Sequence, residues 1–102
     1  MDNYKIKFSS RADNDLNNIY DYIKEKLSDF ENAVKVYEKI KGGISTLEYF
    51  PKRHPKVDVN GNIYSELRML VIDSYVVIYL IEEDSKEVNI KRILYASSNW
   101  KR

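Results

Sequence analysis

The sequence contains no cysteine, which excludes disulfide bonds and metal sites built on thiolates. No apolar run approaches the roughly 20 residues of a membrane span, and the start from Met1 to Ile6 lacks the basic and apolar regions of a signal peptide. Bulk charge is also missing, since 17 basic and 16 acidic side chains leave a formal net charge of +1. We therefore expect a cytoplasmic protein without cofactor, metal or membrane partner, in which any anion-binding role depends on a local patch.

The length of 102 residues fits one domain, residues 1–102, with a single hydrophobic core. A hydrophobic share of 43% beside 32% charged residues is ordinary for a globular domain. The first element, Tyr4 to Phe8, alternates apolar residues with lysine and predicts a strand with one buried face. Two amphipathic helices should follow, the first capped by Ser10 and the second by Ser28 and ending before Pro51. Because the turn between them is short, they should pack as an antiparallel hairpin.

The second half of the chain predicts a loop followed by three strands. Two prolines mark residues 51–58 as a loop, which Asn60-Gly61 closes as a turn. The three strands at 63–70, 75–81 and 87–95 are joined by short turns and should form an antiparallel meander. Every residue of the middle strand is apolar or aromatic, so both of its faces should be covered. The predicted fold class is α+β in the order β-α-α-β-β-β, with the N-terminal strand and the meander packed against the helix hairpin.

Several short segments, taken together, resemble the RelE/ParE superfamily of type II toxin–antitoxin toxins. They are Tyr4 to Ser9 with Ala12 and Asp15-Leu16, Tyr22-Ile23, Leu47 with Phe50-Pro51, Leu67 to Leu70, Tyr75 to Tyr79, and Val88 to Ala96 with Trp100. The resemblance implies the RelE/ParE fold, a cognate antitoxin as partner and a toxin–antitoxin hetero-oligomer. It leaves two activities open, because members of the superfamily are either ribosome-dependent mRNA endonucleases or DNA gyrase inhibitors.

The residues offer a site for metal-independent RNA cleavage. Attack by a 2′-hydroxyl needs a base, an acid and cations around the phosphate. We take His54, Arg68 and Tyr95 as catalytic candidates, because histidine titrates near neutral pH and Arg68 matches the Leu-Arg pattern of the superfamily. The RNA- or anion-binding candidates are Lys52, Arg53, Lys56 and Arg92. On this reading the chain is an mRNA endonuclease whose partners are the ribosome and mRNA.

Other readings of the same residues remain open. His54 can be a solvated loop residue, Arg68 can brace the sheet, and Arg92 is better explained as structural if a carboxylate pairs with it. Ser97-Ser98-Asn99 stands where many relatives carry arginines, and the first helix is acidic, with Asp13, Asp15, Asp21 and Glu25. The alternatives are therefore a gyrase inhibitor without catalytic residues and an inactive homologue that still binds its antitoxin.

Overall fold

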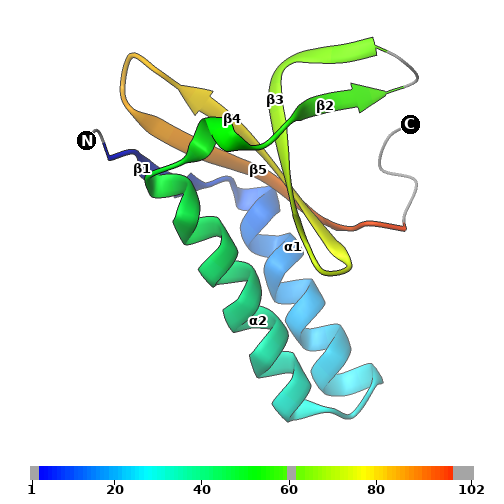
Figure 1. Ribbon diagram of the computed structural model, residues 1–102. Coiled ribbons are helices and arrows are strands. Elements are labelled where there is room, and N and C mark those ends of the chain that lie inside the picture. Colours follow the sequence, from blue (N-terminus) through cyan, green and yellow to red (C-terminus); the bar gives the residue numbers. More distant parts are fainter. Residues whose placement is uncertain (1–2, 60–61, 98–102) are drawn as a thin grey trace.

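The computed structural model describes residues 3–59 and 62–97, and Figure 1 shows two helices against one face of a twisted sheet. The described elements confirm the predicted α+β class, in which a helix hairpin packs on an antiparallel meander. The sheet has the order β1-β5-β4-β3-β2. In chain order the elements are β1 (Lys5–Phe8), α1 (Ser10–Asp21), α2 (Phe30–Ser45), β2 (Lys56–Val59), β3 (Asn62–Ile72), β4 (Tyr75–Glu82) and β5 (Glu87–Tyr95).

The helices begin where the sequence predicts, but each is capped by a neighbour of the predicted residue. The Ser9 hydroxyl, not that of Ser10, accepts the Ala12 N–H at 3.0 Å. The Asp29 carboxylate likewise replaces Ser28 as cap of α2. Ser28 adopts a positive φ of 51° in the turn between the helices, where it cannot serve as an extended N-cap. Adjacent Ser and Asp residues are all good caps, so sequence alone does not choose between them.

The first strand pairs with the last one. β1 lies parallel to the first half of β5, with Phe8 opposite Ile90. Beyond that point α1 lies along the edge of β5. The hydroxyl of Ser9, the N-cap of α1, donates to the Lys91 carbonyl at 2.9 Å. The N-terminal strand and the first helix together therefore cover one edge of β5.

A bulge in β5 changes which side chains of this strand share a face. Ile78 lies opposite Arg92 whereas Tyr79 lies opposite Ile90, so Lys91 is an extra residue. One extra residue reverses the alternation of side chains beyond it. Regular pairing would place Arg92 and Leu94 on the face of Ile90, but Ile93 takes that place in the core beneath the helices.

The segment predicted to be a loop contains a strand at its end. β2 pairs antiparallel with β3, and Lys56 lies opposite Arg68. The loop prediction for residues 56–58 was therefore wrong, because Pro51 and Pro55 concealed a short strand that pairs with the next strand along the chain. The predicted turn at Asn60-Gly61 lies outside the described residues.

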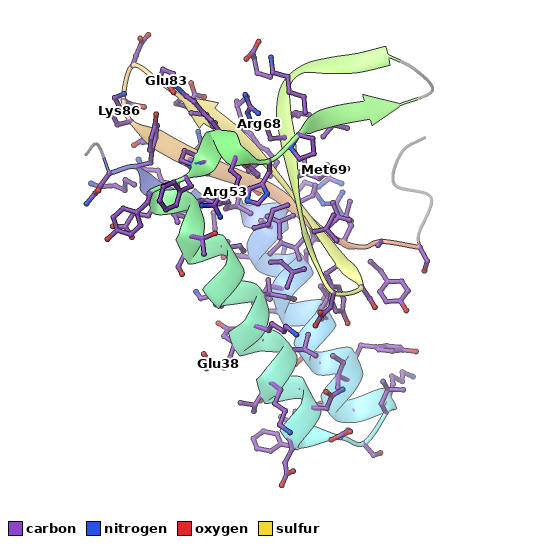
Figure 2. All side chains as sticks on the ribbon, in the orientation of Figure 1. Glu38, Arg53, Arg68, Met69, Glu83 and Lys86 are labelled. Atoms are coloured by element: carbon purple, nitrogen blue, oxygen red, sulfur yellow. The ribbon has the colours of Figure 1, made fainter. Side chains whose placement is uncertain are left out.

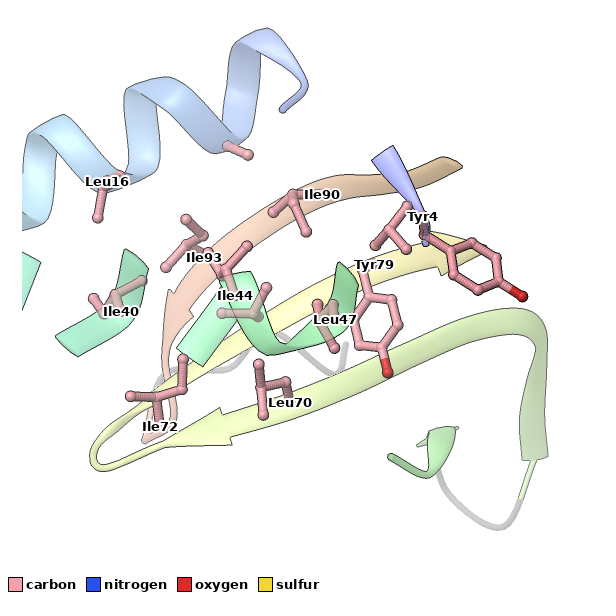
Figure 3. Close-up of a cluster of buried hydrophobic side chains, with 13 residues drawn as sticks. Tyr4, Leu16, Ile40, Ile44, Leu47, Leu70, Ile72, Tyr79, Ile90 and Ile93 are labelled. Carbon is pink, nitrogen blue, oxygen red and sulfur yellow. The ribbon is translucent and has the colours of Figure 1, made fainter. Parts of the chain in front are cut away.

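The main core lies between the helix hairpin and the sheet (Figure 3). A smaller cluster of Val57, Val76 and Ile78 lies on the opposite face, where β2 folds over β4. β4 therefore contributes Val77 and Tyr79 to one face and Val76 and Ile78 to the other, which confirms the central strand covered on both faces. The side chains buried beneath the helices are Tyr4, Ala12, Leu16, Ile40, Ile44, Leu47, Leu70, Ile72, Val77, Tyr79, Val88, Ile90 and Ile93.

Candidate functional site

The basic segment, residues 51–56, connects α2 to β2 and contains Lys52, Arg53, His54 and Lys56. Pro51 begins a short 3-10 turn, Pro51–Arg53, in which its fixed φ suits the first position. Pro51 itself is buried, whereas Lys52, Arg53 and Lys56 are exposed. A buried residue thus anchors the segment and leaves its cations in solvent.

Arg68 of β3 holds the basic segment by its backbone. Its Nη1 donates to the carbonyl oxygen of His54 at 2.7 Å and to that of Lys52 at 3.4 Å. The Met69 N–H donates to the Pro55 carbonyl at 3.0 Å. Figure 2 shows Arg68 and Met69 on β3 beside this segment. The half-buried guanidinium therefore fixes the path of the segment while its charge stays next to His54.

His54 lies against the central strand. Its ring is half-buried and meets the Tyr79 ring edge-on, with centroids 6.5 Å apart. Burial and the nearby charges of Arg53 and Arg68 lower the pKa of His54 from its ordinary 6.5. The Tyr79 hydroxyl donates to the Pro51 carbonyl at 2.5 Å, and burial raises the pKa of Tyr79 to about 12. The uncharged imidazole is favoured at neutral pH, a form that can accept a proton.

The carboxylate of Glu83, which the sequence did not indicate as part of the site, neutralises Lys52 of the basic segment. Glu83, in the turn between β4 and β5, binds Lys52 Nζ at 2.9 Å and Lys86 Nζ at 3.3 Å. It also accepts a hydrogen bond from the Tyr4 hydroxyl at 2.9 Å. The bonds from Lys52 and Tyr4 lower the pKa of Glu83 to about 2. An acidic turn signal, Glu82 to Asp84, was visible in the sequence, but its distance of about 30 residues from Lys52 concealed the pairing.

Arg92 has a carboxylate partner on the first helix. Its Nε and Nη2 donate to the two carboxylate oxygens of Asp15 at 2.7 and 3.1 Å. The backbone N–H of Ile93 donates to the same carboxylate at 2.9 Å. The hydrogen bonds and charge of Asp15 raise the pKa of Arg92, and the three contacts together join β5 to α1. The geometry matches the structural reading of Arg92.

Tyr95 lies far from the other two catalytic candidates. It is 52% exposed, and its ring packs edge-on against Tyr75 with centroids 5.6 Å apart. Tyr75 is also its partner in the β4–β5 pairing. Tyr75 and Tyr79 are four positions apart on β4, which corresponds to about 13 Å along a strand. The structure thus brings His54 and Arg68 together and leaves Tyr95 and Arg92 elsewhere.

A groove near the other end of the sheet was not foreseen from the sequence. It has a volume of about 750 Å³ and separates the helix hairpin from the turn between β3 and β4. Tyr22 and Leu27, which line it from the π-helical turn Tyr22–Lys26 and its end, are 57% and 55% exposed. The other lining residues are Asn18, Ile19, Ile23, Asn32, Val36, Asp73, Ser74, Tyr75 and Tyr95. The groove is mainly apolar and suits an apolar side of a partner segment.

Within residues 3–59 and 62–97, no three His, Cys, Asp or Glu side chains gather in a way that could hold a metal ion. No helix in the same residues is long and apolar enough to cross a membrane. Of the segment Ser97-Ser98-Asn99, only Ser97 lies within the described residues, and Trp100 lies outside them.

The fold is that of the RelE and ParE toxins. A structure of the chromosomal ParDE system from P. aeruginosa superposes with a TM-score of 0.76 at 20% identity, over 95% of this chain and 100% of the other. The isolated E. coli RelE toxin gives 0.66 at 13% identity, over 95% and 88%. The archaeal RelE–RelB complex from Pyrococcus horikoshii OT3 gives 0.61 at 17% identity, over 93% and 97%.

The sequence comparisons then identify the family. The model of the ParE toxin of the type II toxin–antitoxin system parDE matches residues 6–100. The chain therefore belongs to the ParE toxin family, as the resemblance to the RelE/ParE superfamily indicated. A comparison with curated protein sequences gives no match.

Proposed function

We propose that this chain is a toxin that arrests growth by binding DNA gyrase, as the ParE branch of its superfamily does, and not by cutting mRNA. The observation that carries the proposal is the separation of the catalytic candidates. Tyr95 of β5 pairs with Tyr75, which lies four residues along β4 from Tyr79, the residue whose ring contacts His54. Arg92 is neutralised by Asp15. Cleavage through a 2′-hydroxyl requires base, acid and cations around one phosphate, and these side chains do not surround one point.

The test measures both activities of the purified toxin and of cells that produce it. We expect gyrase supercoiling to fall as toxin is added, and translated mRNA to stay intact while growth stops. His54→Gln should inhibit supercoiling as well as the wild type, because proton transfer plays no part. Normal supercoiling at a large excess of folded toxin would overturn the proposal.

A ribosome-dependent mRNA endonuclease is the second candidate, favoured by one observation. His54 and Arg68 lie together beside the exposed cations Arg53 and Lys56, so a base and positive charge meet at one place. This function predicts cleaved transcripts after induction, and loss of cleavage in His54→Ala. Absence of both cleavage and gyrase inhibition, with antitoxin binding retained, would identify the inactive homologue.

We also infer that the partner is an antitoxin and that a helix of the antitoxin occupies the 750 Å³ groove. The groove supports this because its exposed Tyr22 and Leu27 offer apolar surface between the helix hairpin and the β3–β4 turn. The alternative landing sites are the sheet face and an edge strand, where acidic antitoxin residues would lie opposite Arg68 and the basic segment. Both surfaces can be compared directly.

The comparison uses two exposed apolar residues of similar exposure. Leu27 lines the groove and is 55% exposed, whereas Val71 is 57% exposed and pairs with Val76 on the sheet face away from the helices. Leu27→Glu should weaken antitoxin binding at least tenfold, while Val71→Glu should bind as the wild type. The reverse order would place the antitoxin on the sheet face.

A further inference from the structure

Two neighbouring aromatic side chains stand in solvent beside the basic segment. Tyr49 and Phe50 connect the end of the α2 region to Pro51 and are 47% and 46% exposed. Their ring centroids are 6.4 Å apart and the rings are tilted by 54°. Large aromatic rings stabilise a fold when they are buried. A pair of them left exposed side by side is therefore typical of a binding surface.

The backbone under these rings is fixed. The N–H groups of Tyr49 and Phe50 both donate to the carbonyl of Thr46, at 3.2 and 3.1 Å. The Phe50 carbonyl in turn accepts the Arg53 N–H at 3.4 Å. The Arg53 guanidinium lies over the Phe50 ring, with Cζ 4.6 Å from the centroid. Arg53 can be located in Figure 2 near the C-terminal end of α2. A cation–π contact of this kind orients both the ring and the charge before any ligand binds.

The charge around the rings is positive. From residue 48 to residue 56 the chain has three cations, Lys52, Arg53 and Lys56, and one carboxylate, Glu48. Glu83 pairs with Lys52 from across the sheet. Arg68 adds a further positive charge behind the segment. The surface thus combines aromatic faces with cations, in contrast to the mainly apolar groove at the other end of the sheet.

We propose that Tyr49, Phe50 and Arg53 form a stacking site for unpaired bases of a single-stranded nucleic acid, whose phosphates lie against Lys56. Aromatic rings beside Arg and Lys are the arrangement that binds single strands, because the faces of unpaired bases are free to stack. A duplex hides those faces and would meet the cations alone. The site does not depend on gyrase binding and can be tested without gyrase.

The test measures the fluorescence anisotropy of labelled oligo-dT and oligo-rU, each of about 12 nucleotides, and of a duplex of matched length. We expect both single strands to bind more tightly than the duplex, and the ratio of the two affinities to show which sugar is preferred. Tyr49→Leu/Phe50→Leu keeps apolar bulk and removes the aromatic faces. It should weaken single-strand binding about tenfold or more at unchanged salt dependence. The matched control, Phe30→Leu, removes an exposed ring at the start of α2 and should bind as the wild type.

A second measurement separates stacking from charge. Lys56→Ala should lower the slope of log affinity against log salt by roughly one, with a similar loss for single strand and duplex. The proposal is overturned if single strand and duplex bind equally, if the double leucine variant binds as the wild type, or if no oligonucleotide binds. If no oligonucleotide binds, Tyr49 and Phe50 would instead be assigned to contact with a protein partner.

Discussion

The guanidinium of Arg92 and the carboxylate of Asp15 form two parallel hydrogen bonds that join the last strand to the first helix. The carboxylate also accepts the Ile93 N–H, just beyond the bulge of β5. The Asp15 carboxylate therefore accepts a backbone hydrogen bond from β5 beyond the point where its pairing with β1 ends. The side chains of Asp15 and Arg92 are 14% and 31% exposed. If the pair were broken, water would therefore replace these hydrogen bonds only in part.

Removing this carboxylate should destabilise the domain. We expect Asp15→Ala to lower the free energy of unfolding by about 2–3 kcal/mol, because Arg92 and the Ile93 N–H lose a charged acceptor. Asp21→Ala, on the exposed end of the same helix, should change it by less than about 0.5 kcal/mol. Urea unfolding of the two variants measures the difference, and equal stabilities would contradict a structural role for Asp15.

The two glycines of α2 should respond oppositely to alanine. A Cβ at Gly42 would meet open space, whereas one at Gly43 would lie 2.5 Å from Ile72 Cδ1. Gly42→Ala should stabilise by up to about 1 kcal/mol through helix propensity. Gly43→Ala should destabilise by about 1 kcal/mol, because overpacking exceeds the same gain.

The clash at Gly43 has a direct check. Ile72→Val removes the Cδ1 atom in question, so it should cost less in the Gly43→Ala background than in the wild type. Thermal or urea unfolding of the four proteins gives the coupling. Additive effects would mean that Gly43 is required for some other reason.

The titration of His54 should report its contact with the arginines. Because burial, Arg53 and Arg68 lower its pKa, an NMR titration should have a midpoint below 6.5. Arg68→Met should move the midpoint upward, and the remote Lys39→Met should leave it unchanged. The unfolded chain binds this proton more readily, so His54 lowers stability at acidic pH, and its effect disappears as pH rises past the unfolded pKa near 6.5. A midpoint at or above 6.5 would contradict the half-buried position.

Glu83 should give the domain a separate acid dependence. Its folded pKa of about 2 lies below the ordinary 4.5, so its stabilising effect is complete above 4.5 and is lost as pH falls toward 2. Glu83→Gln should therefore flatten the stability curve in this window compared with Asp84→Asn in the same turn. Parallel curves for the two variants would show that the contacts with Lys52 and Tyr4 have no net effect in solution.

The sequence predicted features whose cause is local. Helix stripes such as Leu16 and Ile40 recur at helical spacing, and the apolar run of β4 indicated burial on both faces. The sequence did not predict what depends on distant partners. The bulge at Lys91 places Ile93 on the face opposite to the one that regular pairing would give it. The hydrogen bonds from Arg68 to two backbone carbonyls have no signature in the side-chain sequence.

The parallel pairing of β1 with β5 also has a consequence for the time course of folding. Residues 5–8 of β1 pair only with residues 87–90 of β5, which are made much later in synthesis (Figure 1). During synthesis the first strand must therefore wait, unpaired, until the last strand has left the ribosome. A nascent chain that has not reached Glu87 cannot complete the sheet, so the toxin acquires its folded surface only after β5 has been synthesised.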